Sequence, residues 1–238
     1  MIQLLDLAVR AHGGLDAWRS IKSIELKASL NGELLRIKGH PEGIIDVLIH
    51  IEAREPALTI TPFGRPDFAG HFLPDRVWLE GNGSGKEQEL RNPRRSFEGH
   101  SIASPWTKLQ ELYFLGYAMW NYLATPFLFA SPGFETKELA PHAENGETWR
   151  RLAVKYPEHI PTHCAEQTFY FGEDGLLRRL DYFVEVVNDA AAHYCYDHKN
   201  FNGFMVPTMR RVVGRSPEGS KPSGPTSVLV QFSDIKFS

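Results

Sequence analysis

The sequence is short of several features that mark whole classes of protein. It has two cysteines in 238 residues, too few for a disulfide framework or a four-cysteine zinc site. Neither sign of charge dominates, since 26 Lys and Arg stand against 29 Asp and Glu, for a formal net charge of −3. A chain without a basic excess matches the phosphate backbone poorly, so we expect no nucleic-acid partner. With 42% hydrophobic and 23% charged residues, the composition also excludes a disordered chain.

Long uninterrupted hydrophobic runs are also missing. The most apolar stretch, residues 109–130, contains Glu111, Asn121 and Pro126. It therefore lacks the roughly 20 consecutive apolar residues of a membrane-spanning helix. The first residues combine Asp6 with apolar residues at helical spacing, which indicates an amphipathic helix and not a secretory signal. We expect a cytoplasmic protein with no integral membrane contact.

Sequence motifs for phosphate, dinucleotide, serine-hydrolase and zinc-protease chemistry do not occur in the chain. The pair His193 and His198 does not change this expectation. The two residues are five apart in an expected strand and so lie on opposite faces, whereas a metal site within one strand favours even spacing. We expect no metal and no cofactor.

Alternation of apolar and polar residues predicts a chain made mostly of strands. Residues 24–31 alternate in this way, and Asn31-Gly32 resembles a hairpin turn that leads to a return strand at residues 34–38. Further strands are expected at residues 47–52, 58–60, 76–80, 148–156, 167–171, 176–187, 191–200, 205–214 and 227–237. The polar residues 86–95 are expected to form an exposed strand and loop, and residues 216–225 a Pro/Gly/Ser-rich loop. No repeat or linker divides the chain, so we expect one domain over residues 1–238.

One long helix interrupts the strands. Apolar residues recur at spacings of three and four between Thr107 and Leu123, Ser104-Pro105 is a start signal, and Thr125-Pro126 ends the pattern. A sheet of roughly nine to eleven strands does not stay flat. The expected fold is therefore α+β: a single large curved antiparallel sheet, a half-barrel wrapped around one central helix, plus a short N-terminal helix.

Three segments resemble the LolA-like proteins, a superfamily that includes lipoprotein-sorting carriers. They are residues 12–24, which open into a strand, residues 113–129, and residues 193–211, with a glycine turn between two strands. The resemblance implies a half-barrel with a hydrophobic cavity for acyl or other apolar groups, without a particular activity. A similar fold serves a cofactor-free enzyme of violacein synthesis. Classical LolA-like carriers are exported, whereas this sequence begins without an export signal.

The aromatic residues are unevenly distributed. Nine of the 28 Phe, Tyr and Trp residues lie between Trp106 and Phe134. Packing under a sheet accounts for many of them, but a buried Tyr hydroxyl needs a partner, and Tyr and Trp commonly line small-molecule sites. We assign ligand binding to residues that follow this pattern in and after the helix: Trp106, Tyr113, Tyr117, Trp120, Phe127 and Phe129.

Histidines near the aromatic segments are the candidate acid–base groups: His193, His198 and His100. In the strand at 191–200, Tyr194, Tyr196 and His198 share one face, while His193, Cys195 and Asp197 share the other. The sequence does not decide which face lines the cavity. We place Tyr194 and Tyr196 in the ligand site, with a nucleophilic Cys195 as a minor alternative.

Two adjacent arginine pairs, Arg178-Arg179 and Arg210-Arg211, lie in expected strands. One member of each pair points inward, where a guanidinium would hold a carboxylate or phosphate group. The simpler alternative is an ion pair with an acidic residue of a neighbouring strand. We assign Arg211 to the ligand site.

The sequence favours a binding protein for a small hydrophobic or aromatic molecule held in the half-barrel cavity. The alternative is a cofactor-free enzyme that uses His and Tyr as acid–base groups in a hydrophobic pocket. A third possibility, a docking protein that uses the curved sheet as its surface, ranks last.

Overall fold

A single antiparallel sheet dominates the computed structural model, which describes residues 3–81, 83, 85–215 and 224–238. Its 13 strands lie in the order β6-β5-β4-β3-β2-β1-β13-β12-β11-β10-β9-β8-β7. Their bounds are β1 Ser23–Asn31, β2 Ile44–Glu52, β3 Leu58–Thr61, β4 Phe68–Leu73, β5 Arg76–Gly81, β6 Gly85–Arg91, β7 Glu135–Glu144, β8 Glu147–Lys155, β9 Glu166–Phe171, β10 Leu177–Val184, β11 Asp189–Phe201, β12 Phe204–Gly214 and β13 Val228–Phe237. Neighbouring strands are consecutive in the chain except at the centre, where β1 pairs with both β2 and β13.

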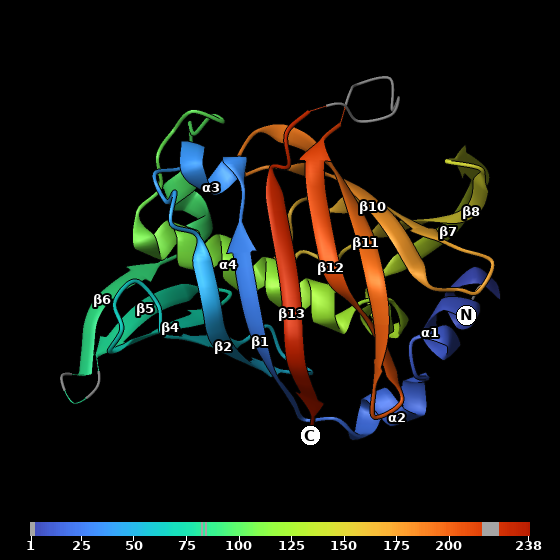
Figure 1. The fold of residues 1–238 in the computed structure, drawn as a ribbon, viewed down its shortest axis with the longest axis horizontal. Helices are drawn as coiled ribbons and strands as arrows, with labels where there is room; N and C mark the ends of the chain where they lie inside the picture. Colours follow the sequence, from blue (N-terminus) through green and yellow to red (C-terminus); the bar gives the residue numbers. More distant parts are fainter. Residues whose placement is uncertain (1–2, 82, 84, 216–223) are drawn as a thin grey trace.

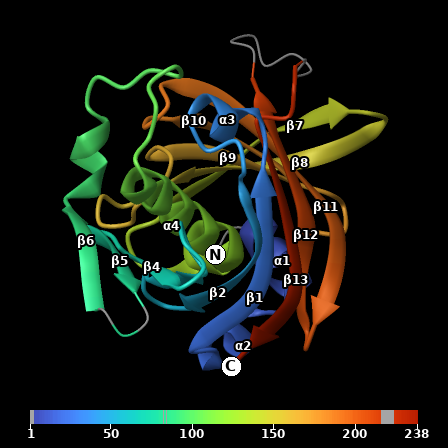
Figure 2. The ribbon, with the colours of Figure 1, turned by 60° about the vertical axis from the view of Figure 1, so that its left-hand side comes forward.

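The sheet curves around the helix α4, which runs across its concave side (Figure 1; Figure 2). The helices of the described residues are α1 Gln3–Ala11, α2 Leu15–Ser20, α3 Glu33–Ile37 and α4 Lys108–Ala124, with 3₁₀ turns η1 Pro93–Phe97 and η2 Phe127–Ala130. The expected α+β half-barrel around a central helix is confirmed. The sheet has 13 strands where the sequence predicted nine to eleven.

The helix α4 is enclosed on all sides. Every residue from Gln110 to Ala124 is buried, as expected for a helix that is apolar around its circumference. It begins at Thr107, whose hydroxyl accepts from the backbone of Gln110 while the Gln110 side chain accepts from the backbone of Thr107. This reciprocal capping satisfies two N-terminal donors and fixes the start of the helix.

Close packing between α4 and β4 requires a residue without a side chain at Gly116. A Cβ there would lie 2.3 Å from Cγ of Phe72, a ring that is 1% exposed. We expect Gly116→Ala to destabilise the protein by about 1–3 kcal/mol, because overpacking outweighs the gain of about 1 kcal/mol in helix propensity. Urea unfolding measures the change. Gly214→Ala is the control, since a Cβ at Gly214 meets nothing within 4 Å; equal stability of the two variants would contradict the prediction.

The return strand predicted for residues 34–38 is wrong. These residues form the short helix α3, and β1 pairs instead with β2 and β13. Glu33, Leu34, Leu35 and Arg36 are all good helix formers, and a helix buries Leu34 and Leu35 together. Gly32 precedes the helix with φ 139°, and a Cβ there would lie 2.4 Å from the carbonyl oxygen of Ser227, so the glycine serves this close approach and not a hairpin turn.

The sequence analysis did not predict two of the strands, β7 and β4. The edge strand β7 is polar on both faces, contains Pro141, and has an irregular register between Leu139 and His142. Such a strand shows no apolar alternation, and Pro is tolerated at a sheet edge. The strand β4 lies in a stretch that gave no strand prediction, although Phe68 and Phe72 on its inner face are buried. The loop predicted at 216–225 lies outside the described residues up to 223.

A small second cluster lies on the convex face, opposite α4. It contains Trp149, Tyr170, Ala192, Tyr194 and Val213. At its centre Arg179, 1% exposed, donates two bonds to Asp181, at 2.6 and 2.8 Å, and one to Glu144 at 2.7 Å. Because Glu144 is the last residue of β7, this ion-pair network ties the edge hairpin back onto the middle of the sheet.

Candidate functional site

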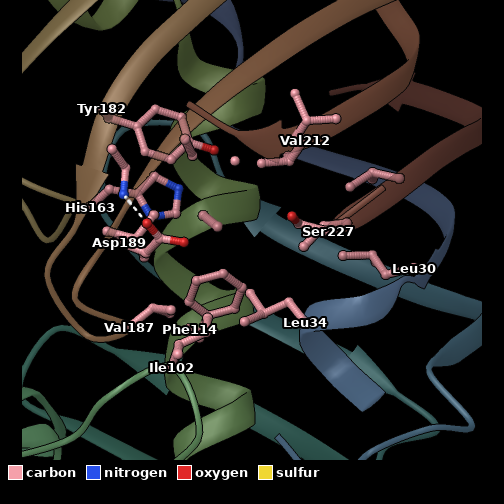
Figure 3. Close-up of a pocket in the computed structure, with 18 of the residues that line it drawn as sticks. Leu30, Leu34, Ile102, Phe114, His163, Tyr182, Val187, Asp189, Val212 and Ser227 are labelled. Atoms are coloured by element: carbon pink, nitrogen blue, oxygen red, sulfur yellow. Dashed lines mark hydrogen bonds between the residues drawn. The ribbon is translucent and has the colours of Figure 1, made fainter. Parts of the chain in front are cut away.

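A narrow apolar cavity lies between α4 and the concave face of the sheet. Its lining comes from α3, α4, β1, β10, β11, β12, β13 and nearby loops, and it includes the exposed Asp189 at the start of β11 (Figure 3). The apolar part includes Leu30, Leu34, Phe114, Ala118, Met119 and Val212. Its volume of about 50 Å³ admits a few water molecules, so an acyl chain or ring enters only if lining side chains move. Met119 is the most adaptable of these side chains.

One wall of the cavity is polar. His163, from the loop before β9, stacks on the ring of Tyr182 with centroids 4.1 Å apart. Its Nδ1 lies 3.1 Å from the hydroxyl of Tyr117 and its Nε2 lies 3.1 Å from that of Tyr122. The hydroxyl of Tyr182 lies 3.4 Å from that of Tyr122 and 3.2 Å from Nδ1 of His193. These five side chains form one buried hydrogen-bonded chain.

The buried chain carries no charge at neutral pH. Burial lowers the pKa of His163 to about 3 and that of His193 well below its ordinary value. Burial also raises the pKa of Tyr122 to about 12 and that of Tyr182 well above its ordinary value. Removal from water disfavours the charged form of each group, so the imidazoles stay neutral and the phenols stay protonated.

Of the three predicted acid–base histidines, the structure brings only His193 next to the cavity wall. His193 is fully buried and contacts Tyr122 with ring centroids 4.7 Å apart. His198 lies with its ring centroid 6.5 Å from that of His12, and burial lowers its pKa to about 4. His100 lies beside Phe97, with centroids 5.6 Å apart, ahead of α4. The three histidines therefore do not form one site.

The predicted aromatic ligand residues are buried around α4, but none of them borders the apolar cavity. Tyr117 joins the polar wall through His163. Tyr113 borders a separate hollow beside Arg94, and Trp120 and Phe127 border another beside Trp18. Trp106 and Phe129 pack in the core. The face of α4 that does line the cavity carries Phe114, Ala118, Met119 and Tyr122.

The strand β11 turns its tyrosines away from α4. Tyr194 and Tyr196 lie on the convex side with their rings stacked 6.3 Å apart, and Tyr196 is 38% exposed. His193 and Cys195 therefore occupy the inner face, the alternative that the sequence left open. Arg211 is exposed and donates to the hydroxyl of Thr226, 2.8 Å away. Its neighbour Arg210 is the member of the pair that points inward, with 1% exposure.

Sequence reasoning missed His163, Tyr182 and Arg210. His163 lies in a loop rich in proline, where no periodicity indicates which side chain turns inward. Tyr182 belongs to a strand that was expected, but its inner face carries no motif. Arg210 had a usable signal, since alternation along β12 places it with Val212 on the face opposite Arg211.

The described part of the chain has neither a metal-ligand cluster nor a membrane-spanning helix. No group of three or more His, Cys, Asp or Glu side chains with metal-site geometry occurs in residues 3–81, 83, 85–215 and 224–238. Over the same part of the chain, no helix has the length and apolar content needed to cross a membrane.

Comparison with known proteins identifies the fold. The chain matches no protein-family model and no curated protein. It is similar to the structure of a LolA superfamily protein from Nitrosomonas europaea, with 12% identity, a TM-score of 0.55, and coverage of 99% of this chain and 93% of the other. A putative outer membrane lipoprotein-sorting protein domain from Vibrio parahaemolyticus is similar at 11% identity and a TM-score of 0.53, with coverage of 98% and 92%. The chain has the LolA-like fold that its sequence resembles.

Proposed function

We propose that this protein binds a small hydrophobic or aromatic molecule in the cavity between α4 and the concave face of the sheet. The observation that carries the proposal is a mostly apolar cavity with one uncharged, hydrogen-bonded polar wall, the usual composition of a small-molecule site, and with the exposed Asp189 as its one acidic lining residue among those described. The name of the similar Vibrio parahaemolyticus domain, a lipoprotein-sorting protein domain, agrees with an apolar ligand, because lipoproteins carry acyl chains. The cavity is narrow, so binding requires the lining to widen.

Filling the cavity tests the proposal. Ala118 lies on α4, lines the cavity and is 1% exposed. We expect Ala118→Leu to weaken binding of the neutral apolar dye N-phenyl-1-naphthylamine by at least about tenfold, because the added side chain occupies the space the dye would take. Dye titration by fluorescence measures the change, and native mass spectrometry of the purified protein identifies any copurified ligand.

The control is Ala69→Leu, on β4 and away from the cavity lining. Ala191→Val adds less volume to the cavity and keeps the test available if Ala118→Leu folds poorly. Failure of the unchanged protein to bind the dye or any apolar probe contradicts the proposed function. So does equal binding by a well-folded Ala118→Leu variant.

The enzyme alternative rests on one contact, between the hydroxyl of Tyr182 and Nδ1 of His193 at 3.2 Å. Burial moves the pKa values of these two groups apart, with His193 lowered and Tyr182 raised. The proton therefore stays on the phenol, and the pair is better suited to hold a polar group of a ligand than to transfer a proton. Chemical change of a bound probe during incubation would favour the enzyme.

The cytoplasmic location expected from the sequence remains a prediction. Cell fractionation tests it.

A further inference from the structure

The guanidinium of Arg210 is buried without a counter-ion. Arg210 is 1% exposed and points from β12 toward α4, and no carboxylate lies within 4 Å of it among the described residues. One of its terminal nitrogens donates to the carbonyl oxygen of Tyr122 at 3.1 Å, and the other to Sγ of Cys195 at 3.4 Å, a weak acceptor. Its Nε has no hydrogen-bond partner. A buried charge in this state is costly unless something pairs with it.

The groups around Arg210 supply no negative charge. Its guanidinium lies over the ring of Tyr122, 4.9 Å from the centroid, and 5.8 Å from that of Phe232. Burial raises the pKa of Tyr122 and of Cys195, so the phenol and the thiol both stay protonated. His193, on the neighbouring strand, is neutral for the same reason. Arg210 is therefore a full positive charge among uncharged neighbours.

A second unpaired nitrogen lies next to the same tyrosine ring. Nε2 of His193 has no partner, and the imidazole meets the ring of Tyr122 edge-on at 4.7 Å. When Nδ1 of a neutral imidazole accepts the proton of the Tyr182 hydroxyl, the ring carries its own proton on Nε2. Two buried nitrogens without acceptors thus belong to side chains that contact Tyr122, and one of these side chains is a cation.

These nitrogens adjoin the apolar cavity. His193 pairs across the sheet with Val212, and Arg210 pairs with Val230. Tyr122, Val212 and Val230 all line the cavity. An elongated molecule in the cavity would therefore contact mostly apolar side chains, and the unpaired donors lie next to Tyr122.

Given the apolar cavity of the proposed function, on which this inference rests, we infer that the ligand is an amphiphile with an acyl tail and a carboxylate head, a fatty acid. Arg210 and His193 bind the head by donating from Nε and Nε2, and the tail fills the space beside Phe114, Ala118 and Met119. Tyr122 separates the two regions and its ring turns aside when the head enters. A carboxylate meets both requirements, an acceptor for each nitrogen and a counter-charge for the guanidinium.

Three probes of equal chain length test the inference: dodecanoate, dodecan-1-ol and dodecylamine. Each competes with N-phenyl-1-naphthylamine in a fluorescence displacement assay. We expect dodecanoate to bind at least about tenfold more tightly than dodecan-1-ol, and dodecylamine to bind most weakly, because only the carboxylate gains a charge-assisted bond to Arg210. Arg210→Met is expected to abolish the preference for the acid while leaving dodecan-1-ol binding within about threefold of the original.

Arg211→Met is the matched control, since the adjacent side chain is exposed on the other face, and we expect it to keep the preference for dodecanoate. Arg210→Lys keeps the charge without Nε and should retain part of the preference, which guards against poor folding of Arg210→Met. Equal binding of the acid and the alcohol to the unchanged protein overturns the inference and leaves the proposed function standing. Binding of none of the probes overturns both. A preference for the acid that survives in Arg210→Met shows that another residue holds the head and also overturns the inference.

Discussion

Replacement of Arg179 by Met is expected to lower the free energy of unfolding by about 3–5 kcal/mol at pH 7. Arg179 is 1% exposed, and it holds the carboxylates of Asp181 and Glu144, which are themselves mostly buried. Removing the guanidinium leaves two mostly buried acids near each other, with only the more distant Arg215, 3.9 Å from Asp181, as a remaining cationic partner. Their mutual repulsion and their loss of hydration make this more costly than loss of a surface ion pair.

Urea unfolding at pH 7 measures the loss, and Arg178→Met is the matched control. Arg178 is the preceding residue of the same strand, but its side chain is 25% exposed and pairs with the partly exposed Asp174. Loss of such a pair costs about 1 kcal/mol or less. Similar unfolding free energies for the two variants would show that the buried network contributes no more than a surface pair.

Replacement of Arg179 by Met should also change hydrogen exchange in one part of the sheet. Glu144 closes β7, which lies four strands away from β11 in the sheet order, and the network holds it against Tyr194 and Arg179. Without Arg179, we expect amide hydrogens of the hairpin β7–β8 to exchange faster than those of β1, β2 and β13. Uniformly faster exchange over the whole sheet would instead indicate a general loss of stability.

Periodic patterns accounted for the parts of the fold that bury one face. The helix at 107–123 and most strands were predicted because their apolar residues recur at the spacing that faces a core. The edge strand β7 was missed because neither of its faces is buried. Residues 34–38 were assigned to a strand because a hairpin signal was given more weight than the helix propensity of Glu33 to Arg36, and a local signal carries no information about which distant strand pairs with β1.

The candidate site depended on facts that one sequence does not contain. Alternation established that one of Arg210 and Arg211 points inward, but choosing between them requires knowing which face of β12 meets α4. The predicted site contains Arg211, whereas the structure turns Arg210 inward. The inward position of His163 could not be predicted, because a loop shows no periodic pattern of apolar and polar residues. The density of aromatic residues in α4 indicated that this helix borders a ligand site. Which face of α4 lines the cavity depends on how the sheet curves around the helix, and the sequence does not show this.

Buried neutral histidine is a recurring feature of the concave side of the sheet. His12, His163 and His193 are each at most 3% exposed, and burial lowers the pKa of His12 to about 4 and that of His163 to about 3. In the unfolded chain these groups have a pKa of about 6.5. The folded state therefore resists protonation over a pH range in which the unfolded state accepts protons readily.

The stability of the protein should consequently fall steeply below pH 6.5. A histidine with a lowered folded-state pKa contributes its full stability above the unfolded-state pKa and loses it as the pH drops toward the folded-state value. At pH 5, His12 and His163 each cost about 2 kcal/mol relative to pH 7, about 4 kcal/mol together, and His193, whose pKa burial also lowers, adds to the loss. Since a typical domain is stable by about 5–15 kcal/mol, we expect unfolding to begin near pH 5. Burial raises the pKa of Glu111, so this one carboxyl group contributes in the opposite direction and stabilises the folded state as the pH falls.

Urea titrations at half-unit steps from pH 7 to pH 4.5 test the expectation, and the slope of unfolding free energy against pH counts the protons taken up. His163→Gln keeps an amide near the hydroxyls of Tyr117 and Tyr122 but removes one titrating group. It should lower stability at pH 7 and reduce the slope between pH 5 and pH 6 by about 1.4 kcal/mol per pH unit. The control His50→Gln, at a side chain 42% exposed, should leave the slope unchanged. An unchanged slope in His163→Gln would mean that His163 is protonated in the folded protein. This result would contradict the conclusion that the hydrogen-bonded wall beside the cavity is uncharged.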